Sequence, residues 1–317
     1  MTPSIDADAT GRAALNALLT ASIKEQRTRR RWGIFFKIVY LIIVLVILAL
    51  IFGKDTESSS TTGKHVALVD VQGIIMDGME ADADNIVKGL TQAFANKNSI
   101  GVILRINSPG GSPVQSDYVF SAMQRLRMQY PDKHLYAVCV DVCASGAYYM
   151  AVGAEKIYAN PSSLVGSIGV LMDGFGFVET LQKVGVERRL LTSGQHKGFL
   201  DPFSPLKVDE LAFAQDMLDD VHQQFINVVK QGRQNRLQLA DPNLFSGMAW
   251  TGNKALDLGL IDDFASAGEV AREAFKTENI VDYTVQPDYL ERFAQVMGAE
   301  MTNKAALLLG LNSPRLH

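Results

Sequence analysis

The stretch IGVILRINSPGGSPVQSDYVFSAMQRLRMQ, residues 100–129, decides the predicted fold because it leads a β-strand through a tight turn into a helix. Its first seven residues are mostly branched and apolar, which is typical of a strand buried on both faces. Pro109, Gly110 and Gly111 then let the backbone change direction sharply before an amphipathic run begins. A strand that feeds directly into a helix indicates one half of a βαβ unit.

The same alternation continues on both sides of this stretch. Strand patterns occur in HVALVDV (65–71) and LYAVCVD (135–141), and helical patterns occur in ADNIVKGLTQAFAN (83–96) and SGAYYMAVG (145–153). Strands and helices that alternate along a chain favour a largely parallel sheet covered by helices, so we predict an α/β fold. No Gly/Pro/Ser-rich linker and no internal repeat divides the region after residue 64, and its roughly 250 residues are expected to form one domain.

A long helix is predicted from about Val208 to Arg236 because apolar residues recur there every three or four positions. The members of this stripe are Leu211, Ala214, Leu218, Val221, Phe225 and Val228. His222 lies on the same helix but outside the stripe. This placement predicts a solvated histidine rather than a catalytic one.

The composition is that of an ordinary folded protein, with 47% hydrophobic and 20% charged residues among 317. The five histidines show no metal-binding spacing, and HExxH, CxxC and P-loop patterns do not occur, so we predict no metal or nucleotide cofactor. Cys139 and Cys143 are four residues apart in a predicted strand, a separation of about 13 Å. That distance is too long for a disulfide, and both are expected to be small core residues.

An apolar segment near the N-terminus, Gly33–Phe52, reads GIFFKIVYLIIVLVILALIF and contains one charged residue. Twenty helical residues span about 30 Å, the thickness of the hydrocarbon core of a bilayer, so we predict a transmembrane anchor. Residues 1–37 carry seven Lys or Arg and three acids, a net charge of +4. Because the whole chain carries −4, residues 38–317 carry −8. This excess of basic residues before the anchor favours a cytoplasmic N-terminus.

Two alternatives to an anchor are a cleaved signal peptide and a long core helix. A basic leader of more than thirty residues is long for a signal peptide, and Ile51 and Gly53 make a poor cleavage site. A core helix rarely stays apolar on every face for five turns. We therefore expect five segments: a basic cytoplasmic segment (1–32), the anchor (33–53), a polar tether (54–64), a folded domain (65–287) and an amphipathic tail (288–317).

Ser145 lies in DVCASGAYYMA, where the strand at 135–141 meets the start of a helix. A serine at this place is most often a helix N-cap. It also lies at the carboxyl edge of the predicted sheet, where open α/β folds bind their ligands. Its neighbours Ala144, Gly146 and Ala147 are small and leave room for a substrate. From this segment alone, an N-cap and a nucleophile are equally good interpretations.

Further polar residues occur in LVGSIGVLM (164–172), which contains Ser167, and in LLTSGQHKGFLDPF (190–203), which contains His196 and Lys197. A serine hydroxyl needs a base to take its proton as it attacks. A lysine serves as that base only when its amine is neutral, a form that burial favours. His196 is the alternative base, although no acid stands in an obvious position to orient its ring.

Five sequence blocks, taken in order, resemble the signal peptide peptidase A family of membrane-bound serine proteases. The blocks are NSPGG (107–111), ASGAYYMA (144–151), GSIGV (166–170), SGQHKGFLDPF (193–203) and FSGMAWTGNKALDLGLID (245–262). The resemblance covers most of the chain after residue 64 and is to the shorter, single-domain form. It implies a ClpP/crotonase-like βαβ superhelix behind one N-terminal transmembrane helix.

The resemblance also implies a role for each matching residue. Ser145 would attack the scissile carbonyl, Lys197 would act as general base and then as general acid, and Ser167 would hold the lysine amine. His196 would then be a bystander. Backbone amides would bind the oxyanion, and the candidates are those of Gly110, Gly111, Ser112 and Gly146.

The partners implied by the resemblance are signal peptides and other apolar peptides, the lipid bilayer and further copies of the chain in a ring. It also implies a bacterial inner membrane location with the catalytic domain outside the cytoplasm, and no nucleic acid is expected to bind. Two other functions stay open: a crotonase-like acyl-CoA enzyme, which the same fold supports, and a catalytically silent membrane scaffold. Ser145 and Lys197 in their motifs argue against both, and extracytoplasmic placement argues against CoA.

Overall fold

The computed structural model describes residues 29–46 and 63–285. The chain divides into two compact units, Met1–Thr61 and Thr62–His317. Residues 29–46 of the first unit form a helix, which covers the first part of the predicted anchor. Within the two described ranges, no helix combines the length and the apolar content needed to cross a bilayer.

Several predicted segments lie outside the described residues. They include residues 47–53 of the predicted anchor, nearly all of the tether, most of the basic N-terminal segment and the amphipathic tail at 288–317.

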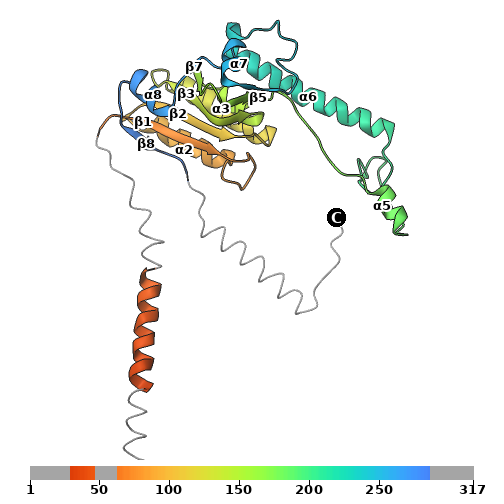
Figure 1. Cartoon of the computed structure of the whole chain (residues 1–317), viewed down its shortest axis with the longest axis horizontal. Coiled ribbons are helices and arrows are strands. Elements are labelled where there is room, and N and C mark those ends of the chain that lie inside the picture. The colour runs from red at the N-terminus through yellow and green to blue at the C-terminus, as the bar shows by residue number, and fades with distance from the viewer. Residues whose placement is uncertain (1–28, 47–62, 286–317) are drawn as a thin grey trace, which may run out of the picture. The chain divides into compact units, whose positions relative to one another are not determined.

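The second unit is built on one mixed sheet of mainly parallel strands (Figure 1). The strands are β1 (His65–Gln72), β2 (Ser99–Ser108), β3 (Leu135–Ala144), β4 (Lys156–Ala159), β5 (Leu164–Gly166), β6 (Ala249–Thr251), β7 (Asp263–Phe264) and β8 (Ile280–Asp282). Their order is β6-β5-β3-β2-β1-β8, with β4 pairing β3 and β7. Every pair is parallel except β5 with β6. The predicted α/β fold with a largely parallel sheet is confirmed.

Helices cover both faces of the sheet, which explains why its strands are apolar throughout. The helices are α2 (Ala83–Ala95), α3 (Pro113–Gln129), α4 (Gly146–Ala151), α5 (Val178–Lys183), α6 (Val208–Arg233), α7 (Gly252–Asp257) and α8 (Ala267–Glu273). Along β1 the side chains alternate: Ala67 and Val69 join the larger core under α2, α3, α4 and α6, whereas Val66 and Leu68 join a smaller core under α8.

Strand β3 is irregular near the predicted site, where its register with β2 shifts and its neighbour on the other side changes from β4 to β5. Ile106 of β2 pairs with Cys139, but Ser108 pairs with Cys143, so β3 uses four residues where β2 uses two. Asn107 supports the extra residues by accepting a hydrogen bond from the amide of Val142 at 3.1 Å. The first half of β3 therefore pairs with β4, and its last residues pair with β5.

This irregularity corrects the spacing predicted for the two cysteines. Both are buried and free, as expected for core residues. The regular strand spacing of about 13 Å does not apply, because β3 is not regular between them. Burial, and then a hydrogen bond to Cys139, raise the pKa of the Cys143 thiol well above its ordinary value. Cys143 is therefore held as an unreactive thiol.

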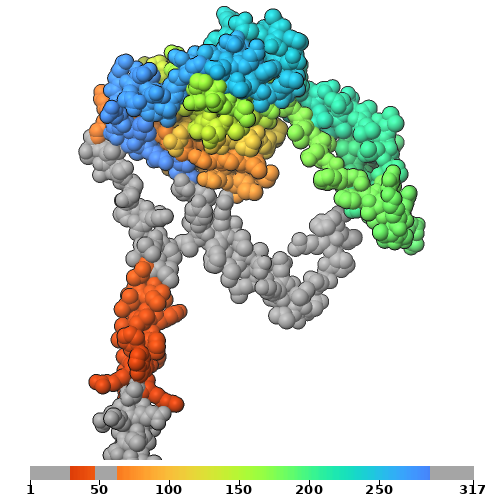
Figure 2. Space-filling view, in the orientation of Figure 1, coloured from red at the N-terminus to blue at the C-terminus, as the bar shows by residue number. Residues whose placement is uncertain are grey.

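Helix α6 matches the predicted long helix, but only its C-terminal half is buried in the body. Phe225 and Val229 are buried, whereas Leu211 of the predicted stripe is 46% exposed. In Figure 1, α6 extends from the body toward α5, and Figure 2 shows residues near 180–207 (green) against its N-terminal part. The leading half of the stripe therefore lies away from the sheet, beside an arm formed by residues 170–207 (Figure 2), and Leu211 stays largely exposed there.

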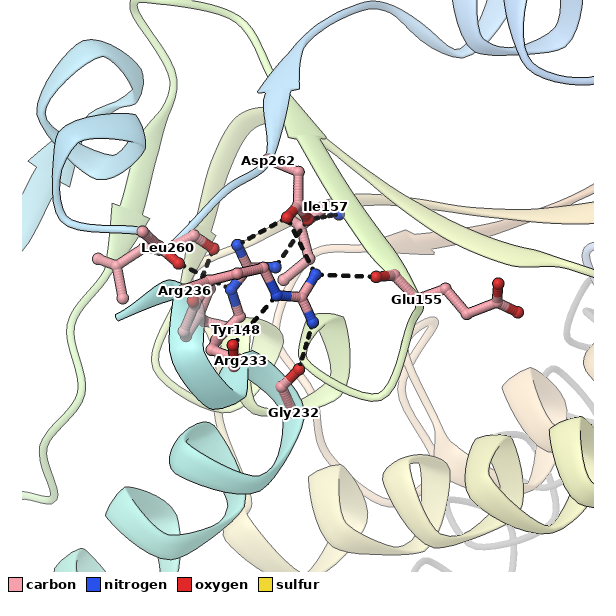
Figure 3. A network of polar contacts seen from close by, with 9 residues as sticks. Tyr148, Glu155, Ile157, Gly232, Arg233, Arg236, Leu260 and Asp262 are labelled. Carbon is pink, nitrogen blue, oxygen red and sulfur yellow. Dashed lines mark hydrogen bonds and ion pairs between the residues drawn. The ribbon is translucent and has the colours of Figure 1, made fainter. Parts of the chain in front are cut away.

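The C-terminal end of α6 is fixed by a buried ionic network (Figure 3). Arg233, only 1% exposed, donates to both carboxylate oxygens of Asp262 at 2.7 and 3.0 Å. Arg236 donates to the same carboxylate at 2.9 Å, and Asp262 also accepts from the amide of Ile157 at 2.7 Å. Tyr148 donates to the carbonyl of Leu260 nearby at 2.7 Å. One aspartate therefore joins α6 to β4 beside the helix that follows Ser145.

We expect Asp262→Ala to lower the free energy of unfolding by about 3–5 kcal/mol, because it leaves Arg233 buried without its counter-charge. For a domain of this size the melting temperature should fall by roughly 10 °C, as measured by differential scanning calorimetry. Asp263→Ala removes the exposed neighbouring carboxylate and should change stability by less than about 0.5 kcal/mol. Equal losses in both variants would show that the buried network is not what stabilises this region.

The ionic network around Asp262 also predicts how the stability of the protein depends on pH. Burial raises the pKa of Asp262, but the hydrogen bonds and charge of Arg233 lower it more, so the net shift is downward. A carboxyl group whose pKa is lower in the folded than in the unfolded protein stabilises the fold at pH values above its unfolded-state pKa of about 4. That stabilisation is lost as the pH falls through the folded-state pKa. Wild type should therefore lose its stability advantage over Asp262→Ala below about pH 4.

Candidate active site

The pairing of β3 with β5 brings two predicted site residues together. The register joins Ala144 to Gly166, so Ser145 and Ser167 follow directly at the carboxyl ends of adjacent parallel strands. The amide of Ser145 donates to the carbonyl of Gly166 at 2.8 Å, and the amide of Ser167 donates to the carbonyl of Met248 at 2.8 Å. Both serines are thus held by backbone hydrogen bonds at the edge where α/β sheets bind ligands.

The backbone of Ser145 is strained in a way that exposes its hydroxyl. Its dihedral angles are φ 55° and ψ −126°, and Ser145 and Ser167 are two of five non-glycine residues with positive φ in the described part of the chain. Such conformations cost about 1–3 kcal/mol and cluster at functional sites. The Ser145 side chain makes no capping hydrogen bond at the start of α4. Ser145 therefore stands at the N-cap position of α4 without capping it through its side chain, and its hydroxyl is available for other chemistry.

The turn after β2 lies against Ser145 and offers one free amide. Gly110 has φ 100°, and a Cβ atom there would lie 2.7 Å from the Cβ of Ser145, so only glycine fits. The amide of Gly110 donates to the hydroxyl of Ser108 at 3.1 Å, and the amide of Ser112 donates to the carbonyl of Ile75 at 2.8 Å. Of the three predicted amides in this turn, only that of Gly111 is left.

The amide of Gly146 lies close to that of Gly111. A Cβ atom built on Gly146 would be 3.4 Å from the amide nitrogen of Gly111. Among residues 63–285, neither of these two amides donates to a backbone or side-chain acceptor outside its own helix or strand. Gly111 and Gly146 are therefore neighbours, and their two unoccupied N–H groups are candidates to bind one oxyanion beside the Ser145 hydroxyl.

A cavity of about 860 Å³ opens in front of these groups. The strand ends and turns contribute Gly110, Gly111, Ser145, Gly146, Ser167 and Gly247. Helix α3 contributes Asp117, α4 contributes Tyr149, and α6 contributes Val221, His222 and Phe225. The volume is in the range of ordinary ligand sites, and the mixture of apolar walls and convergent polar groups is typical of them.

The predicted solvated position of His222 is wrong. His222 is partly buried, lines the cavity, and its Nε2 lies 3.1 Å from the carbonyl oxygen of Ile168. The prediction failed because the apolar stripe describes packing on the sheet, whereas this part of α6 also faces the turn between Ser167 and Gly169.

Tyr149 and Asp117 are cavity residues that the sequence motifs did not identify. The amide of Tyr149 donates to the carbonyl of Ser145 at 3.0 Å, which places Tyr149 one helical turn after the serine. That spacing of four residues is the one signal that could have indicated its proximity. Asp117 lies in the first part of α3, where the predicted helix carried no motif.

Lys197 and His196 are exposed on the arm and not in the cavity. Of the residues that the structure describes, neither lines it. Nearby, Phe199 packs edge-on against Phe213 of α6 at 5.7 Å. Phe213 precedes His222 by nine residues, about 14 Å along a helix. The structure therefore brings Ser145, Ser167 and the amides together but does not bring Lys197 to them within one chain.

The sequence is similar to known peptidases. A sequence model described as peptidase family S49 matches residues 128–281. A protein of Enterococcus faecium that carries the name signal peptide peptidase SppA is 28% identical over 290 residues, which is 81% of this chain and 83% of that protein. Protease 4 of Haemophilus influenzae is 29% identical over 228 residues, 71% of this chain and 36% of that protein.

A protein of Brucella abortus named Na(+)/H(+) antiporter NhaA is 42% identical over 186 residues, 59% of this chain. The chain spans about a quarter of the length of that protein, because the match covers 25% of it. The antiporter name belongs to that longer protein. The match to peptidase family S49 over residues 128–281 and the two peptidase relatives together support a serine protease of this family.

Proposed function

We propose that the chain is a membrane-anchored serine endopeptidase in which Ser145 is the nucleophile. One observation carries this proposal: the uncapped hydroxyl of Ser145, held on a strained turn, opens into the same cavity as the unoccupied amides of Gly111 and Gly146. A hydroxyl beside two such amides is the arrangement that acyl transfer requires.

In the proposed reaction, the Oγ of Ser145 attacks the scissile carbonyl carbon while Lys197 takes the hydroxyl proton. The amides of Gly111 and Gly146 bind the oxyanion of the tetrahedral intermediate. The lysine then gives its proton to the leaving amine, and the C–N bond breaks to leave an acyl-enzyme. Water, deprotonated by the same lysine, attacks the ester carbonyl, and the lysine returns that proton to Oγ of Ser145 as the C–O bond breaks and the acid product leaves. Ser167 accepts a hydrogen bond from the lysine amine and keeps it in place.

Lys197 reaches the site from a neighbouring copy in this proposal. The arm that carries it has large apolar side chains in solvent, including Leu171 at 80%, Phe175 at 79% and Leu191 at 97% exposure. An exposed apolar surface of this kind is typical of a protein interface. Packing of the arm on a second copy would cover these side chains, and a lysine enclosed there would lose water and favour its neutral form. The peptidase is therefore proposed to act as a homo-oligomer.

The anchor and its substrates complete the proposal. The helix at 29–46 exposes large apolar side chains such as Phe36, Leu41 and Leu45, at 61, 56 and 55%. Such a surface suits the hydrocarbon of a bilayer. We propose that residues 33–53 cross a bacterial inner membrane once, with 1–32 in the cytoplasm and the peptidase domain, a ClpP/crotonase-like superhelix, outside it. A domain tethered this close to a bilayer meets apolar peptides, including cleaved signal peptides, at high local concentration.

Hydrolysis of a fluorogenic apolar peptide by the full chain in detergent micelles tests the proposed activity. Wild type should cleave the peptide, and His196→Ala should keep kcat/KM within about threefold because Lys197, not the imidazole, is the proposed base. Loss of activity in His196→Ala would move the base to the imidazole. Failure of the assembled wild type to cleave any apolar peptide would favour the CoA enzyme or the scaffold.

A further inference from the structure

The cavity in front of Ser145 has an unbalanced charge. Its titratable lining groups among the described residues are Asp117, Tyr149 and His222, and no lysine or arginine of those residues lines it. Much of the remaining wall is apolar, with Val114, Leu171, Val221 and Phe225. A carboxylate surrounded by apolar groups loses part of its hydration when a substrate fills the space around it.

Asp117 is held in one orientation by Tyr149. The hydroxyl of Tyr149 donates to Oδ1 of Asp117 at 2.8 Å. The tyrosine ring is only 8% exposed and packs edge-on against Phe120 at 5.7 Å and tilted against Phe225 at 5.1 Å. Burial and the hydrogen bond to Asp117 raise the pKa of Tyr149 far above its ordinary value, so the phenol stays protonated and keeps donating.

The second carboxylate oxygen of Asp117 is free to accept from a ligand. Within residues 63–285, Oδ2 has no hydrogen-bond or ion-pair partner. The hydrogen bond from Tyr149 to Oδ1 fixes the plane of the Asp117 carboxylate. An acceptor that is already held in place loses less conformational freedom when it binds a donor. A neutral apolar substrate would shield Oδ2 from water without giving it a hydrogen bond. A cationic group of the substrate would shield Oδ2 and also donate a hydrogen bond to it.

The position of Asp117 relative to the nucleophile limits where that cation lies on the substrate. Tyr149 is four residues from Ser145, about 6 Å along α4, and its hydroxyl donates a hydrogen bond to Asp117. An extended peptide advances about 3.3 Å per residue. The carboxylate is therefore within reach of side chains one to three residues from the scissile bond.

We propose that Asp117 is a specificity-determining residue that binds a cationic group of the substrate peptide, either a lysine or arginine side chain or a free N-terminal ammonium, near the bond cleaved. This inference rests on the proposed peptidase function and deepens it. The preferred substrates are apolar peptides that carry one basic group next to the cleavage site.

Matched peptides test this proposal on the full chain in detergent micelles. One series carries lysine and the other norleucine at each of the three positions on either side of the scissile bond, and each peptide is made with a free and with an acetylated N-terminus. At one position wild type should prefer lysine by about tenfold in kcat/KM. Asp117→Asn should abolish that preference, so that its ratio of kcat/KM for the lysine and norleucine peptides falls to about one. Asp216→Asn, which removes an exposed carboxylate of α6, should keep it.

The acetylated series identifies the source of the cation. A preference for lysine over norleucine that survives acetylation assigns the cation to the side chain. Faster cleavage of peptides with a free N-terminus than of their acetylated forms, lost in Asp117→Asn, assigns it to the terminal ammonium. Both results support the proposal. A lysine preference that is unchanged in Asp117→Asn overturns it, as does an equal loss of kcat/KM for both peptides with the ratio retained.

A binding measurement separates failure of this inference from failure of the proposed function. Fluorescence anisotropy on Ser145→Ala gives Kd for the lysine and norleucine peptides without any cleavage. If wild type cleaves neither peptide, the peptidase proposal fails, yet an Asp117-dependent tenfold difference in Kd still supports the cation site. Equal Kd values for the lysine and norleucine peptides at every position, together with equal Kd values for free and acetylated N-termini, overturn it.

Discussion

Ser145→Ala is expected to lower kcat for peptide hydrolysis by about 10⁵ to 10⁶-fold. The reason is that the substitution removes the uncapped hydroxyl that opens into the cavity with the unoccupied amides of Gly111 and Gly146. The remaining amides still polarise a bound carbonyl, so a small residual rate above the uncatalysed reaction is expected. Initial rates with a fluorogenic peptide at saturating substrate measure the effect.

A matched serine serves as control for this result. Ser121→Ala removes an exposed hydroxyl on α3, away from the cavity lining, and should leave kcat within about twofold of wild type. Thermal unfolding of both variants checks that they remain folded. More than about 1% of the wild-type kcat in Ser145→Ala would mean that another group attacks the substrate.

Lys197→Ala is expected to be equally inactive, and a mixture with Ser145→Ala should recover activity. If each site takes its serine from one chain and its lysine from the next, a random equal mixture contains about one quarter intact sites. The mixture should therefore reach about 25% of the wild-type rate after dissociation and reassembly. This follows from the position of Lys197, which lies on an exposed arm outside the cavity of its own chain.

A second lysine of the same arm controls for general effects on assembly. Lys183→Ala removes an exposed charge at the end of α5 and should keep nearly full activity alone. Size-exclusion chromatography compares the assembly of all variants. An inactive mixture of normally assembled chains would show that serine and lysine must come from the same chain, or that Lys197 is not the base.

The strands and helices around the site could be predicted because their patterns are local. The apolar run at 100–106 and the turn at Pro109 determine their own structure, and β2 and α3 begin within one residue of the expected positions. The irregularity in β3 could not be predicted in this way. It depends on which residues of β2 lie opposite and on support from Asn107, and both are set by pairing between strands.

The candidate site was predictable only in part for the same reason. Ser145 and Ser167 stand in recognisable motifs, and the β3–β5 register explains why they meet. Four amides were predicted as candidates to bind the oxyanion. Only the structure shows that two of them already donate hydrogen bonds within the chain, which leaves the other two. His222 and Asp117 could not be found from sequence, because each reaches the cavity from a helix whose packing pattern says nothing about the neighbouring turn.

Covalent labelling of the assembled wild type with a fluorophosphonate probe tests the central claim, that Ser145 is an activated nucleophile, most directly. Intact-mass and peptide-mapping measurements should find one adduct per active site on Ser145, no adduct on Ser145→Ala, and slower labelling of Lys197→Ala. An adduct on Ser167 or on another serine instead, or an assembled wild type that resists the probe, would contradict the account.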